Sequence, residues 1–200
     1  MISRLKALIK RIQLYIQITE MGPIARRYFV KDGFDGSMTM LGIIVGTWVV
    51  NVTQPEIIVT AGLGACLAMG ISGLSGAYLT EKAERKRELK NLEKAMMTKL
   101  DDSVITDATA FVSFYAAIVD GVSPILTALV SLSPFFLVLH GLLAVENAYI
   151  TSIIVTLVTL FMFGIYLGKI AKENALLYGI QTLVAGVATI VIVLLLGAIY

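Results

Sequence analysis

Charged residues are scarce in this chain of 200 residues, at 15% compared with about 25% in soluble domains. The net charge of +2 is too small to indicate a nucleic-acid partner. A single cysteine, Cys66, excludes an internal disulfide and a cysteine metal cluster. The motifs of serine hydrolases, zinc proteases, P-loop proteins, dithiol enzymes and dinucleotide-binding enzymes are missing. The sequence therefore indicates neither an enzyme nor an ATP-driven pump.

Long uncharged runs take the place of the missing charge. Hydrophobic residues make up 58% of the chain and the mean hydropathy is +0.86. Several uncharged runs approach the ~20 residues that a helix needs to cross a bilayer, whereas the alternating segments of a membrane β-barrel do not occur. We therefore predict an all-α integral membrane protein with five transmembrane helices in one membrane domain, surrounded by the lipid bilayer.

The order of polar and apolar segments divides the chain into four stretches. Residues 1–27 should form an amphipathic helix on the membrane surface, the alternative being a mobile basic tail. Residues 28–80 hold the first two spans, and 81–107 hold a loop and an amphipathic cytoplasmic helix that extends the second span. The last three spans lie in residues 108–200, where we expect the third span to be one long helix, bent or broken at Gly121–Pro124 and at Pro134.

The basic residues predict the topology. All 16 Lys and Arg lie before the first span, between the second and third spans, or between the fourth and fifth, and the opposite loops have none. Because basic loops stay on the cytoplasmic side of a membrane, we expect a cytoplasmic N-terminus and an outside C-terminus.

Two carboxylates, Asp32 and Asp35, stand at the start of the first span, in the stretch KDGFDGSMTMLGIIVG of residues 31–46. The uncharged part of this span, residues 36–52, is short for a bilayer, so its helix should extend back through both acids or tilt or bend. At a spacing of three the acids share a helical face, where mutual repulsion favours uptake of a proton or a cation. We predict a proton-coupled cation site here, to which Met38 adds a softer thioether.

Further acids are candidates for the same chemistry. Asp120, beside the Gly–Pro break, is a second carboxylate, and Glu84 and Glu88 could form a cytoplasmic patch that receives ions. Each candidate has a plainer alternative. Asp120 could cap a helix that begins near Pro124, and the glutamates could belong to a solvated helix with internal ion pairs. The first-span pair could be solvated by cytosol and balanced by Arg26, Arg27 and Lys31.

Small residues recur at a spacing of four along both of the first two spans. The first row is Asp35, Thr39, Gly42 and Gly46, and the second is Gly64, Ala68, Ser72 and Gly76. Such a row permits close packing or leaves room for a pathway, and the sequence does not decide which.

Two motifs resemble the vacuolar iron transporter family over roughly residues 28–200. The first is DGSMTMLGIIVG, with Asp35-Gly36 followed by Gly46, and the second is AGLGACLAMGISGLSGAYLTEKAE, which ends in a Tyr-Leu-x-x-Lys-x-Glu pattern. The resemblance implies a homodimeric, proton-coupled exporter of Fe²⁺ and related divalent metals such as Mn²⁺ from the cytosol, without a permanently bound cofactor. It also implies that Asp35 contributes to the metal route.

Departures from the family pattern concern the ligands. The second-span glutamate of the family falls on Ala65 and its second-span methionine on Gly73, and the long Glu-rich cytoplasmic domain is replaced by one short helix and a loop. We therefore expect Asp35 to be the central ligand and proton acceptor, Asp32 and Met38 to be accessory, and Asp120 to be a second carboxylate.

Two other functions remain open at this point. The chain could be a non-transporting membrane subunit that recruits a partner through its cytoplasmic helix, or a transporter of a different solute. The compact size and the absence of a targeting segment favour a multi-pass protein of a prokaryotic plasma membrane.

Overall fold

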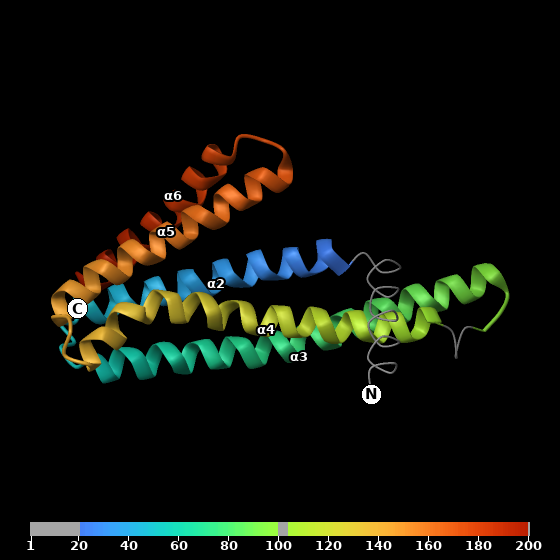
Figure 1. The fold of residues 1–200 in the computed structure, drawn as a ribbon, viewed down its shortest axis with the longest axis horizontal. Coiled ribbons are helices and arrows are strands. Elements are labelled where there is room, and N and C mark those ends of the chain that lie inside the picture. Colours follow the sequence, from blue (N-terminus) through green and yellow to red (C-terminus); the bar gives the residue numbers. More distant parts are fainter. Residues whose placement is uncertain (1–20, 100–103, 200) are drawn as a thin grey trace, which may run out of the picture. The chain divides into compact units, whose positions relative to one another are not determined.

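The computed structural model describes residues 21–99 and 104–199, and every regular element in them is a helix. The helices are α2 (Met21–Val49), α3 (Pro55–Met96), α4 (Val104–Leu139), α5 (Val145–Ala171) and α6 (Ala175–Gly197), as Figure 1 shows. The amphipathic helix expected in residues 1–20 lies outside the described residues. Residues 21–27, which we assigned to that segment, belong to α2, whose first turn accommodates Pro23 because no intrahelical hydrogen bond needs its missing N–H.

Four of these helices are long and apolar enough to cross a membrane: α3, residues Thr106–Leu139 of α4, α5 and α6. The shorter apolar part of α2 begins after Asp35, and the helix runs without interruption through both acids, as expected from the sequence. The expected continuity of the second span with the charged segment is also confirmed, because α3 continues to Met96. It stops where Met97 adopts a left-handed conformation with φ of 52°.

The third span is not broken, although the sequence predicted a bend or a break. Pro124 and Pro134 both lie inside α4, which is a single helix of 36 residues. A hydroxyl group explains how the helix tolerates Pro134. This proline has no N–H for the carbonyl of Val130, and the Ser133 hydroxyl donates to that oxygen at 2.7 Å instead. Pro124 has no N–H for the carbonyl of Asp120, and the nearby Thr127 hydroxyl donates to a different oxygen, the Pro124 carbonyl, at 3.2 Å.

The described residues divide into two compact units. Unit 1 contains residues 21–29 and 71–122, and unit 2 contains residues 30–70 and 123–199. Two apolar clusters form the core of unit 2, one around Met40, Ile44, Ile58, Leu132 and Phe135 and the other around Leu41, Val45 and Leu160.

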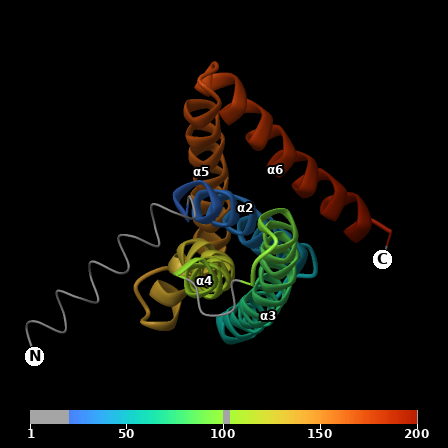
Figure 2. The same cartoon turned by 90° about the vertical axis from the view of Figure 1, so that its right-hand side faces the viewer.

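Close packing of glycines joins α5 and α6 within unit 2. A Cβ atom added to Gly164 would lie 2.6 Å from the Cα of Gly179, so the two backbones are nearly in contact. Figure 2 shows the two helices meeting at their short connection, where the Asn174 side chain caps α6 by accepting from the Leu176 N–H at 3.1 Å.

Candidate functional site

The two acids of α2 lie in different environments. Asp32 is buried, with 8% of its surface exposed, whereas Asp35 is exposed. Lys31 Nζ lies 2.8 Å from Asp32 Oδ1, but the other oxygen, Oδ2, is buried and has no hydrogen-bond partner. A buried oxygen without a partner is costly, so Asp32 Oδ2 is suited to contact a water molecule or a cation.

Two glycines beside Asp32 fit α2 closely to its neighbours in unit 2. A Cβ on Gly33 would lie 2.7 Å from the ring of Phe163 in α5. On Gly36 it would lie 2.5 Å from the Thr127 hydroxyl and 2.7 Å from the Cα of Pro124, both in α4. The part of α2 around residues 33–36 is therefore fixed by contacts that leave no room for a side chain at Gly33 or Gly36.

The row of small residues that contains Asp35 is open. Thr39, Gly42 and Gly46 are half-buried, and a Cβ added to Gly42 would meet no described atom within 4 Å. The row along α3 is more exposed still: Gly64, Ala68, Ser72 and Gly76 are all at the surface. Within the described part of one chain, the row on α3 is exposed, whereas the row on α2 is half-buried and a Cβ on Gly46 would lie 3.9 Å from Val193.

The sulfur atoms of Met38 and Cys66 contact groups other than the acids of α2. The Met38 Sδ accepts a long hydrogen bond of 3.9 Å from the Thr189 hydroxyl of α6, and the side chain packs beside Leu41 and Val45. The thiol of Cys66 is buried and donates to Met40 Sδ at 3.9 Å. In the described residues no three His, Cys, Asp or Glu side chains converge on one point, so this part of the chain does not assemble a complete metal site by itself.

Asp120 lies in the interior of α4, with 6% of its surface exposed. The alternative that it caps a helix beginning near Pro124 is wrong, because α4 begins at Val104. Its carboxylate lies against the bare backbone of α3, since a Cβ on Gly73 would be 2.6 Å from Asp120 Oδ2. Gly73 therefore provides the space that this buried carboxylate occupies.

The glutamates of the α3 extension differ in burial. Glu84 and Glu88 are exposed, and Glu88 Oε2 forms an ion pair with Arg85 Nη1 at 2.9 Å. The buried member is Glu81, at 7% exposure, which our sequence reading did not single out. A signal was present, because Glu81 is the first charged residue after Glu56 and so marks the end of the apolar part of α3.

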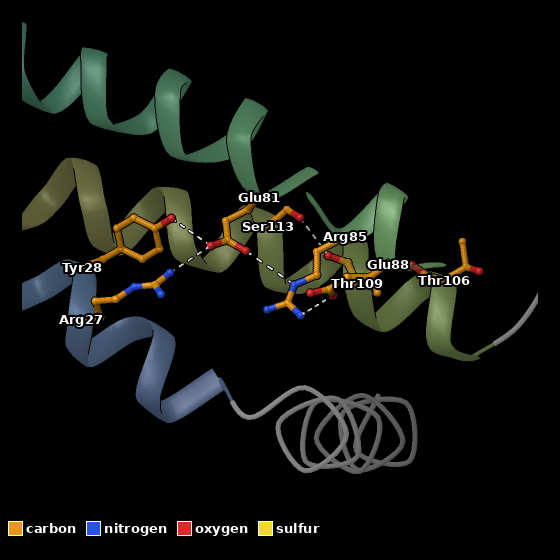
Figure 3. A network of polar contacts seen from close by, with 8 residues as sticks. All are labelled: Arg27, Tyr28, Glu81, Arg85, Glu88, Thr106, Thr109 and Ser113. Carbon is orange, nitrogen blue, oxygen red and sulfur yellow. Dashed lines mark hydrogen bonds and ion pairs between the residues drawn. The ribbon is translucent and has the colours of Figure 1, made fainter. Parts of the chain in front are cut away.

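Figure 3 shows the contacts of Glu81, all within unit 1. The Tyr28 hydroxyl of α2 donates to Glu81 Oε1 at 2.9 Å, and Arg27 Nη2 lies 3.6 Å from the same oxygen. From α3 itself, Arg85 Nε lies 3.5 Å from Oε2. One buried carboxylate thus joins two consecutive residues of α2 to α3.

Comparison with known proteins identifies the family. The model of the VIT family matches residues 26–115 and 90–198, which together cover most of the chain. An uncharacterized protein of the archaeon Methanocaldococcus jannaschii is 32% identical over 174 residues, 86% of this chain and 87% of the relative. Together with the apolar helices described above, these matches show that the chain belongs to the vacuolar iron transporter (VIT) family of multi-pass membrane metal-ion transporters.

Proposed function

We propose that the protein exports divalent cations such as Fe²⁺ or Mn²⁺ from the cytosol in exchange for protons. In this proposal α2 is the first of five spans, the N-terminus is cytoplasmic, and the membrane is a prokaryotic plasma membrane. Family membership supports metal transport. The acids of α2 support divalent cations as the substrate, because carboxylate oxygens are preferred ligands of hard divalent ions. Carboxylates at membrane depth are costly and usually serve ions or protons.

The exposed carboxylate of Asp35, at the start of a half-buried row of small residues, carries the proposal. One chain offers a cation a single carboxylate at this place. In a symmetric dimer the same patch of both copies meets itself, so two Asp35 side chains would face one cation. Gly42 and Gly46 would allow the backbones to approach closely. We therefore propose a homodimer with Asp35 as the central ligand and proton acceptor.

The other candidates take accessory positions in this proposal. Asp32 would assist through its unpaired buried oxygen, and Asp120 would supply a second carboxylate on the route. Glu84 and Glu88, exposed on the α3 extension, would gather cations from the cytosol. Met38 is the weakest candidate because its sulfur already accepts from Thr189, so oxygen ligands should dominate and favour Mn²⁺ and Fe²⁺ over softer ions.

Flux into proteoliposomes tests the proposal. Vesicles that contain a metal-sensitive dye and carry a pH gradient would receive Fe²⁺, Mn²⁺, Co²⁺, Ni²⁺ or Zn²⁺. We expect Asp35→Asn to lower the rate of metal flux at least ~10-fold while the protein remains folded, because the amide carries no charge for the cation. The matched control is Asp107→Asn, which changes an exposed acid in the first turn of α4. Full flux in Asp35→Asn would refute the assignment.

A second function is favoured by one observation on α3. Lys82, Lys86, Lys90 and Lys94 are exposed along its charged half, and Leu92 and Met96 are exposed in the same segment. This surface could recruit a partner protein in a subunit that transports nothing itself. A folded dimer that gives no flux of any metal would favour this alternative. Reversing the charge of these lysines should then abolish recruitment of the partner.

A further inference from the structure

Glu81 is a buried acid that contacts side chains of two helices, and the cation route proposed above does not use it. Its two oxygens are shared by one hydroxyl and two guanidinium groups from α2 and α3 (Figure 3). We propose that Glu81 and Tyr28 are positioning residues for cation uptake: their hydrogen bond holds the start of α2 in the state that receives the cation. This inference rests on the proposed transport function.

The geometry of the network favours a contact that can open. Of the three contacts that Glu81 makes, only the one with Tyr28, at 2.9 Å, has the length of a hydrogen bond. The guanidinium contacts at 3.5 and 3.6 Å are looser, and the Nε of Arg85 is buried without a hydrogen-bond partner. A buried ion pair of this kind adds little stability compared with apolar packing, so stability alone does not account for it.

The position of Tyr28 links this contact to the acids. Tyr28 stands four residues before Asp32 and seven before Asp35 in the same uninterrupted helix. One turn of helix is 3.6 residues, so Tyr28 lies about one turn from Asp32 and two turns from Asp35. In this proposal, a change in how Tyr28 is held reaches both carboxylates along the continuous helix α2.

Loss of the Tyr28–Glu81 hydrogen bond should have a distinctive effect on the kinetics of cation transport. If only a fraction of the protein is in the receiving state, the apparent affinity for the cation falls by that fraction. Saturating cation then restores the receiving state, and the maximal rate is retained. A hydrogen bond to a charged group is strong enough to shift this equilibrium by about 10-fold or more.

The test compares Tyr28→Phe and Glu81→Gln with two matched controls. Tyr115→Phe removes the hydroxyl of an exposed tyrosine in α4, and Glu56→Gln neutralises an exposed acid at the other end of α3. For the first pair we expect the half-saturating Mn²⁺ concentration in proteoliposomes to rise ~10-fold, with the maximal rate within about twofold of the native protein. The controls should change neither value.

Hydrogen–deuterium exchange of residues 21–31 gives a second measurement that does not depend on flux. Exchange should be faster in Tyr28→Phe than in the native protein, and saturating Mn²⁺ should restore the native rate. A fall in maximal rate with unchanged half-saturation would mean that less protein is folded and would overturn the inference. So would native kinetics in Tyr28→Phe beside an inactive Asp35→Asn. Absence of flux from the native protein, with no effect of Mn²⁺ on exchange, would instead overturn the transport proposal together with this one.

Discussion

The helices inside each of the two units are held together by a different kind of contact. In unit 1 a buried carboxylate, Glu81, joins α2 to α3 through a tyrosine and two arginines. In unit 2 the closest contacts are made by glycines such as Gly36 and Gly164, where one helix backbone touches its neighbour. Between helices surrounded by lipid, burial of apolar surface gives little advantage, so close fit must supply the attraction. The comparison teaches that side-chain size should matter most in unit 2 and charge most in unit 1.

The strongest test of this contrast is Gly36→Ala. Its Cβ would lie 2.7 Å from the Cα and 2.8 Å from the O of Pro124, which are backbone atoms that cannot rotate away. We expect the substitution to destabilise the protein by about 1–3 kcal/mol, the usual cost of overpacking. Thermal unfolding in detergent, followed by circular dichroism, would measure the loss.

Gly22→Ala is the matched control, because it makes the same change on the same helix where no described atom lies within 4 Å. This variant should unfold at or above the native temperature. If both variants unfolded at the same temperature, the close fit of α2 to α4 at Gly36 would be wrong.

Gly73→Ala tests whether size matters in unit 1 as well. The added Cβ would lie 2.6 Å from the Asp120 carboxylate and 3.2 Å from its carbonyl oxygen. Because a side chain can shift where a backbone cannot, we expect a smaller loss than at Gly36, about 1 kcal/mol. The same unfolding measurement applies, with Gly76→Ala as the comparison on an open face of α3. Equal stability of the two variants would show that Asp120 is free to leave Gly73.

Composition and charge predicted much of the fold. The uncharged runs predicted the apolar helices, and α5 and α6 lie within residues 108–200, where the last spans were expected. The local rule was less successful in the third span, where Pro124 and Pro134 were expected to bend or break a helix that the structure shows without a break. The rule considers the lost N–H alone, whereas at Pro134 the Ser133 hydroxyl donates to the carbonyl that lost its N–H donor.

The candidate site was predicted less completely. Periodicity placed Asp32 and Asp35 on neighbouring positions of one helix but could not say that one is buried and the other exposed, because burial depends on which helices lie beside α2. Spacing along the chain also suggested that Met38 lies near the acids, whereas its sulfur contacts Thr189, 151 residues away in sequence. Glu81 was missed for the same reason, since its partners on α2 are distant in sequence.

The smallest expected effect on stability concerns Glu88, the exposed acid that pairs with Arg85 beside Glu81. Glu88 forms an ion pair with Arg85, but 55% of its side chain is exposed, and water and salt weaken such pairs. We expect Glu88→Gln to change the free energy of unfolding by no more than about 0.5 kcal/mol, and by less in 0.5 M NaCl, in thermal unfolding experiments. Glu81→Gln, measured alongside, should cost more because it removes the charge of a buried side chain that faces the largely buried guanidinium group of Arg85. Equal losses in the two variants would mean that the network stabilises unit 1 as a whole, and that burial of Glu81 does not set it apart.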